Sequence, residues 1–191
     1  QRWRARANLG ERLFRDPSGK SPIPDYTTAI TGSPLTAIHQ PDDASRAAQL
    51  LIDAMKQTSG GTSGTEQHFN DRAVEILSAL FYAATLTQRH ISDVYWWLSA
   101  GPTSPKWDEP IRLLEKARSE IIGEGTDPAT VKVLLSEQIF LDTLNKEKAA
   151  SASSHPGESA SAMATALRML KPYSTEDARR LADTATTFNP A

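Results

Sequence analysis

The strongest constraint on the fold is a stripe of apolar residues between residues 67 and 88. Apolar side chains recur there every three or four positions, the spacing that places them on one face of an α-helix: Phe69, Ala73, Ile76, Leu77, Leu80, Phe81 and Ala84. A face this apolar has to pack against other elements, because its exposure to water is unfavourable. We therefore expect the helix at 67–88 to build the core.

Weaker stripes of the same spacing predict further helices along the chain. They lie near 42–57, 92–100, 110–122, 131–144, 163–170 and 178–185, and residues 2–15 allow a short basic helix. No segment shows the convincing alternation of a strand. The chain is therefore predicted to be all-α, with about seven to eight helices. Because the helices differ in length and their connections are short, we expect an irregular orthogonal bundle.

Composition along the chain suggests a division into two parts. Residues 1–40 read as a basic segment followed by an irregular, proline-rich connector, and residues 41–191 as a helical domain. Within that domain, residues 58–66 have the Gly, Ser and Thr content of a flexible linker. Because the chain begins with Gln1 instead of Met, we expect it to be a piece of a longer protein.

Charge and cysteine content exclude several classes of protein. The net charge of −2 does not indicate a general affinity for nucleic acid or for anionic membranes. The absence of cysteine excludes disulfides and thiolate metal sites. No apolar run approaches the roughly 18 residues of a membrane span. The first 20 residues are an exception to the even charge balance, because they hold six basic residues against two acidic ones.

A glycine-rich loop precedes the long helix, which is the outline of a phosphate-binding site. A Walker A loop needs a lysine for the terminal phosphates and a preceding strand. The stretch Gly60–Gly64 has neither, and Glu66 stands where a positive charge would help. We interpret the stretch as a tether between two helices.

No catalytic or metal-binding constellation is visible. The four histidines, His39, His68, His90 and His155, have no histidine partner three or four positions away, whereas a zinc site needs three or four clustered ligands. No G-x-S-x-G elbow of a serine hydrolase occurs. We expect no metal, no cofactor and no enzymatic activity in this chain.

The densest aromatic stretch is Tyr95-Trp96-Trp97. Neighbours on a helix lie about 100° apart, so all three side chains cannot face the core. Trp97 fits the inside, and an exposed Tyr95 or Trp96 would suit contact with a partner. Alternatively, the aromatic residues form a wide flank of the core that is packed by residues 101–107, with Trp107. We favour this alternative, because single exposed aromatic residues are ordinary.

Taken in order, these features resemble the all-α domain of the VirD4/TraG/TraD family of type IV coupling proteins. These are ring-forming, DNA-translocating ATPases of bacterial conjugation and type IV secretion, with an all-α domain inserted in the motor. The matching residues are Pro34-Leu35; Ala44, Ala47 and Ala48; Phe69, Ala73, Leu77, Leu80 and Ala83-Ala84; Val94, Trp97 and Leu98; Ser161, Thr165, Ala166, Leu170 and Pro172; and Phe188-Asn189-Pro190. One departure is Asn70, where the family usually has Trp.

The resemblance implies a role in receiving substrate. In this family the all-α domain lies on the cytoplasmic side of the motor and is implicated in engaging the relaxase, its DNA, or other secreted proteins. The parent would be a homo-hexamer anchored in the inner or cell membrane, using ATP and Mg²⁺ at Walker motifs that this chain lacks. Residues 1–32, with "GERLFRDPSGKS", would be the edge of the motor. The fragment itself would be monomeric and cytoplasmic.

Candidate contacts for such a substrate are basic and aromatic side chains. They are Arg2, Arg4, Arg6, Arg12, Arg15, Lys106 and Arg112, with Tyr95 and Trp96 as partner-contact aromatics. The sequence leaves open whether the partner is protein or single-stranded DNA. Two rival hypotheses remain: a structural domain that supports ring assembly without selective contacts, and a free-standing helical enzyme.

Overall fold

The computed structural model describes residues 13–14, 28–29, 33–59, 64–121, 127–153 and 157–183. Its α-helices are α2 (Pro41–Ser59), α3 (Gly64–Thr85), α4 (Ile91–Ala100), α5 (Asp108–Ile121), α6 (Pro128–Ser151), α7 (Gly157–Met169) and α8 (Glu176–Asp183). Three short 3₁₀ helices join them: η1 (Pro34–Ala37), η2 (Pro105–Trp107) and η3 (Lys171–Tyr173). The all-α class is confirmed, with the described helices at the low end of the predicted number.

One small element among the described residues is not helical. Strands β1 (Leu13–Phe14) and β2 (Thr28–Ala29) pair in parallel, with Leu13 opposite Thr28. The prediction of a helix over residues 2–15 is therefore wrong at Leu13–Phe14, and the rest of that range lies outside the described residues.

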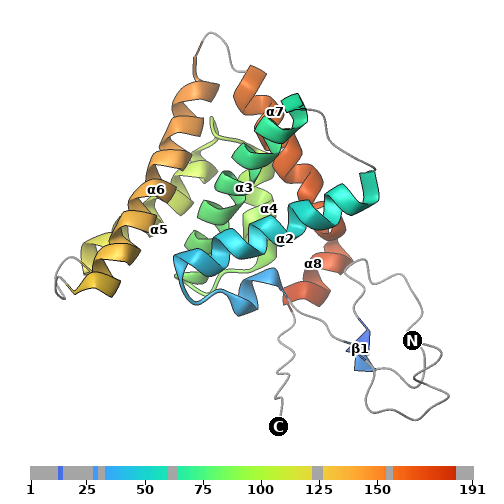
Figure 1. Cartoon of the computed structure of the whole chain (residues 1–191), viewed down its shortest axis with the longest axis horizontal. Helices are drawn as coiled ribbons and strands as arrows, with labels where there is room; N and C mark the ends of the chain where they lie inside the picture. The colour runs from blue at the N-terminus through green and yellow to red at the C-terminus, as the bar shows by residue number, and fades with distance from the viewer. Residues whose placement is uncertain are drawn as a thin grey trace.

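The core is built around α3, as the apolar stripe predicted. Figure 1 shows α3 at the centre, with α6 and α7 on its two sides and α2 crossing in front. Every residue from 76 to 84 is buried. A stripe on one face predicts burial on that face alone, whereas this part of α3 is covered all round. The reason is that α2, α4, α5, α6 and α7 all contact α3.

Helices extend further than predicted in two places. The predicted linker at 58–66 is shortened from both ends, because α2 continues to Ser59 and α3 begins at Gly64. Residues 60–63 lie outside the described residues. The small, polar stretch at 150–162, which separates the helices predicted at 131–144 and 163–170, is helical at both ends, because α6 runs to Ser151 and α7 begins at Gly157. Alanine and serine there are compatible with helix, since Ala has the highest helix propensity.

Residues 33–40 pack against the helical core. Ser33 caps η1 by accepting a hydrogen bond from the Leu35 N–H at 3.2 Å. Leu35 and Ile38 are buried in the same apolar cluster as α3. The end of the predicted connector is thus in contact with the domain that follows it.

Candidate functional site

The structure brings three of the predicted contact residues together and adds a fourth. Tyr95 and Trp96 on α4 lie beside Lys106 of η2 and Arg179 of α8. We call these four residues the Trp96 patch. Of the other candidates, Arg2, Arg4, Arg6, Arg12 and Arg15 lie outside the described residues. Arg112 is exposed on α5, where its Nε donates to the Asp108 carbonyl of the same helix at 3.2 Å.

Two cations flank an exposed indole in this patch. Trp96 is 53% exposed, and the Lys106 Nζ lies 5.3 Å from the centroid of its ring. The Arg179 guanidinium lies 4.6 Å from the Tyr95 ring centroid and 6.0 Å from that of Trp96. The two rings meet edge to face, with centroids 6.5 Å apart. These are cation–π distances, which favour placing positive charge over the ring faces.

The fold fixes α4, which presents the two aromatic rings. The Asp93 carboxylate accepts from the His90 N–H at 3.0 Å at the start of the helix, and Gly101 ends it with φ of 79°. On the inner side, Trp97 is buried and its Nε1–H donates to Glu109 at 3.0 Å. Because α4 is anchored through this inner face, Trp96, which immediately precedes Trp97, points outward.

Hydrogen bonds also hold the backbone that carries Lys106 and the guanidinium of Arg179. The Ser104 side chain caps η2 by accepting from the Lys106 N–H at 3.3 Å. The Arg179 guanidinium donates to the carbonyl oxygens of Tyr173 at 3.0 Å and Ser174 at 2.9 Å. Arg179 therefore stands at a defined position against the Tyr95 ring.

Neither cation of the Trp96 patch forms an ion pair with a carboxylate in the described part of the chain. Other cations do: Arg89 pairs with Glu109, Lys132 with Asp42 and Lys148 with Asp108. Carbonyl oxygens and aromatic rings stabilise a cation without neutralising its charge. The patch thus presents net positive charge beside an exposed aromatic face, a surface suited to anionic groups and flat apolar groups.

The sequence-based preference for an aromatic core flank is half right. Trp97 and Trp107 are in the core, and the Trp107 Nε1–H donates to the Leu144 carbonyl at 3.2 Å. Trp96 is not, because the loop at 101–107 places Lys106 beside it without covering it. Sequence reasoning missed Arg179, which lies on a different helix. Its positive charge was the only feature of the sequence that pointed to a role in binding.

A second cluster of charged and polar groups lies between α3, α6 and α7, buried at Arg72, Glu147 and Ser159 and exposed at Glu158 and His68. We call it the Arg72 cluster: Arg72, Glu147, Glu158, Ser159 and His68. The Arg72 Nε donates to Glu147 at 2.5 Å, and its Nη1 lies 2.8 Å from Glu158. The other Glu147 oxygen accepts from the Ser159 hydroxyl at 2.7 Å, and His68 lies 2.8 Å from Glu158. Burial disfavours the Arg72 charge, but the two carboxylates outweigh it and raise its pKa.

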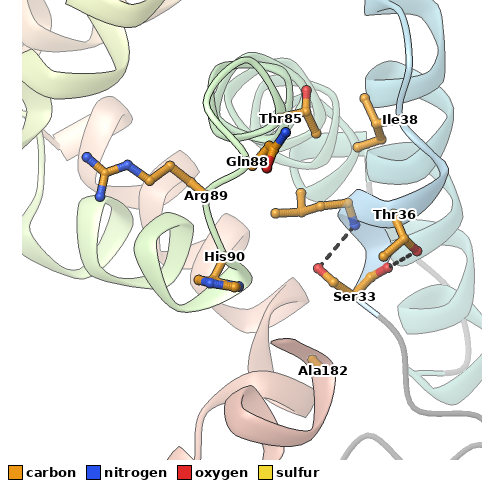
Figure 2. Close-up of a pocket in the computed structure, with 9 residues that line it drawn as sticks. Ser33, Thr36, Ile38, Thr85, Gln88, Arg89, His90 and Ala182 are labelled. Carbon is orange, nitrogen blue, oxygen red and sulfur yellow. Dashed lines mark hydrogen bonds between the residues drawn. The ribbon is translucent and has the colours of Figure 1, made fainter. Parts of the chain in front are cut away.

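A pocket of about 380 Å³ opens where α3 ends. Figure 2 shows the Ser33 side chain on the side of Gln88 and His90, with Thr36 behind it and Ala182 of α8 below. The surface of its lining is mainly apolar, and the polar groups in it include the hydroxyls of Ser33, Thr36 and Thr85 and the Gln88 amide. This volume is within the range of small-ligand pockets.

Among the described residues, no group of three or more His, Cys, Asp or Glu side chains is arranged to hold a metal ion. Among the same residues, no helix has the length and apolar character needed to cross a membrane.

Comparison of the chain with protein-family models, with curated proteins and with solved structures finds no match.

Proposed function

We propose that this chain is the all-α, substrate-recognition domain of a VirD4/TraG/TraD-type coupling protein, and that the Trp96 patch contacts the substrate. This assignment of the contact surface rests on one observation: the half-exposed Trp96 lies between two cations that have no carboxylate partners among the described residues. The substrate is a relaxase or another secreted protein, or single-stranded DNA. The parent, a cytoplasmic-facing homo-hexameric ATPase, would hold ATP and Mg²⁺ outside this chain, and the domain itself performs no covalent step.

The chemistry of the patch fits a recognition role. Tryptophan and arginine are enriched among the residues that dominate binding energy at protein interfaces. Exposed aromatic rings beside positive charge are also how single-stranded nucleic acid is held, by base stacking and phosphate attraction. Both kinds of partner need an anionic or flat apolar group at Trp96, and electrostatic steering by Lys106 and Arg179 would speed the encounter.

A salt-dependent binding titration tests the proposal and separates the two partner classes. Fluorescence anisotropy would follow labelled single-stranded DNA and labelled relaxase from the same transfer system. For DNA, we expect affinity to fall steeply with salt, and Lys106→Gln to reduce the slope of log K against log salt by about one. Lys116→Gln is the matched control, because Lys116 is exposed on α5 and pairs with Glu120. If neither ligand binds, the recognition role is wrong.

A second candidate, a structural domain that supports ring assembly, is favoured by a different surface. On α6, Val131, Leu135 and Ile139 are 41%, 62% and 61% exposed. Their spacing of four residues places them on one side of the helix, opposite buried residues such as Leu144. This apolar stripe would suit packing against a neighbouring subunit.

Sedimentation analysis of the parent hexamer tests this candidate. If the domain only supports packing, Leu135→Ser would break the ring while Trp96→Ala would leave it intact. If the domain recognises substrate, Leu135→Ser would leave substrate binding by the isolated chain unchanged.

A further inference from the structure

At the pocket where α3 ends, Gln88 has a backbone conformation that is unusual for a glutamine. Gln88 has φ of 53°, the only positive φ at a non-glycine residue in the described part of the chain. Its N–H donates to the Thr85 carbonyl at 3.2 Å, and the Arg89 N–H donates to Ala84 at 2.8 Å. This is a Schellman helix end, which usually has glycine at the left-handed position. At the end of α4, by contrast, the residue with positive φ is a glycine, Gly101 at φ of 79°.

The Gln88 side chain receives no structural compensation for this conformation. Its amide makes no hydrogen bond to the described residues, unlike the amides of Gln49, Gln67 and Gln138, which donate to an aspartate four residues later at 3.0, 2.5 and 2.8 Å. The Gln88 side chain is exposed, so its amide is open to a ligand, and a strained backbone at such a position is often found at functional sites. In Figure 2 the Gln88 side chain lies at the pocket, between Thr85 and Arg89.

The other groups around the pocket indicate what it can hold. Leu35, Ile38 and Ala182 are only 5–6% exposed and give it an apolar wall. The Ser33 hydroxyl accepts from the Leu35 N–H, which leaves its own proton available for donation. The Arg89 side chain points away from the Ser33 side in Figure 2 and pairs with Glu109. The pocket therefore offers amide and hydroxyl groups and the His90 imidazole beside an apolar wall, while its arginine is paired with Glu109.

We infer that this pocket binds an uncharged amide that carries a compact aliphatic group. The ligand's amide pairs with the Gln88 side chain, which can donate and accept at once, and its aliphatic group lies against Leu35 and Ile38. This site is separate from the Trp96 patch and goes beyond the proposed function. Two sources share the chemistry: one residue of an extended peptide, or a free small amide.

Two-dimensional ¹H–¹⁵N NMR on the full 191-residue chain tests the inference. The probes are N-acetyl-L-leucinamide, which represents a peptide residue, and isovaleramide, which represents a small amide. We expect saturable shifts of the Gln88 side-chain NH₂ signal and of the Ser33 and Thr36 amides, while the Gln138 side-chain signal stays unmoved. Tighter binding of the leucinamide assigns a peptide source, and equal binding assigns a small molecule. Absence of saturable shifts with both probes overturns the inference.

A charged probe and a variant pair make the test stricter. N-acetyl-L-leucine, with a free carboxylate, is expected to bind at least about fivefold more weakly than the leucinamide, because a carboxylate loses hydration without gaining a cation. Equal or tighter binding would show that the ligand class is wrong. Gln88→Gly keeps the left-handed conformation available, so the fold is retained while affinity falls roughly tenfold through the lost amide contacts.

The control for this variant is Gln138→Ala, which removes an exposed amide from α6 and is expected to leave binding unchanged. If Gln88→Gly binds the leucinamide as tightly as the wild type, the inference fails. The result is independent of the proposed function, because Trp96→Ala is expected to retain probe binding.

Discussion

The Arg72 cluster and the Trp96 patch both place cations against other helices, but they satisfy those cations differently. Arg72 is 10% exposed in its side chain and meets two carboxylates, Glu147 and Glu158. Lys106 and Arg179 meet aromatic rings and carbonyl oxygens, with a half-exposed indole between them. A cation whose charge is neutralised internally serves the fold. A cation whose charge is not compensated by a carboxylate, beside an exposed aromatic ring, is available to a partner.

Among substitutions that test this difference, we expect the largest effect, a loss of stability, in the buried part of the Arg72 cluster. Glu147→Ala would leave Arg72 buried without its main partner, at a cost of about 3–5 kcal/mol in the free energy of unfolding. Urea denaturation measures this cost. Asp142→Ala on the same helix is the control, because Asp142 is exposed and its loss is expected to cost under about 0.5 kcal/mol. Similar small losses for both variants would show that the cluster does not hold the three helices together.

Asn70 is a third kind of polar side chain, one that is buried without a partner among the described residues. Asn70 is fully buried, and neither its Nδ2 nor its Oδ1 has a hydrogen-bond partner among the described residues. Asn70→Leu is therefore expected to raise the free energy of unfolding by about 1–3 kcal/mol, because an unsatisfied buried group is removed. Thermal unfolding of this variant beside Asn145→Leu, an exposed position on α6, isolates the effect of burial. Loss of stability in Asn70→Leu would mean that the amide is satisfied in solution.

At the Trp96 patch, the expected effect on stability is smaller. Trp96→Ala removes two exposed cation–π contacts, so the free energy of unfolding should fall by no more than about 1 kcal/mol. Trp97→Ala, one residue later, removes a buried indole and should cost about 3–5 kcal/mol. Chemical denaturation of the two variants side by side compares the two faces of α4. Equal losses would show that Trp96 is part of the core.

The smallest effect concerns the exposed edge of the Arg72 cluster. The hydrogen bond from His68 and the charge of Arg72 lower the pKa of Glu158 in the folded state. A lowered folded-state pKa contributes stability above the unfolded-state pKa, and this contribution is lost as pH falls through the folded-state value. The stability difference between the wild type and Glu158→Gln should therefore shrink as pH falls below about 4, the ordinary range of a glutamate. A difference that grows on acidification would contradict this reading of Glu158.

Local pattern was enough to predict the helices but not the charged sites. The stripe at 67–88 predicted the central helix, because helical periodicity is a property of neighbouring residues. Arg72 and Glu147 meet across 75 positions of sequence, and no local rule pairs them. Arg179 likewise reaches Tyr95 only because α8 packs on α4. The left-handed Gln88 gave no signal, because sequence rules expect glycine or asparagine at that position.

The same limit explains the exposed stripe on α6. Val131, Leu135 and Ile139 are apolar and helically spaced, so the sequence assigned them to the same helix as the buried Leu141 and Leu144. When apolar residues lie on two opposite sides of a helix, the sequence pattern does not show which side is buried. Only the packing of α3 and α5 against one side of α6 decides which residues are buried.

The most direct test of the central claim is the dissociation constant of the substrate, relaxase or single-stranded DNA, for Trp96→Ala relative to the wild type. We predict a loss of at least about tenfold in affinity, the size of a dominant interface residue, with the unfolding free energy nearly unchanged. Lys116→Gln should leave the constant unaltered. An unchanged dissociation constant for Trp96→Ala would contradict the account, because the exposed indole between Lys106 and Arg179 would then have no part in recognition.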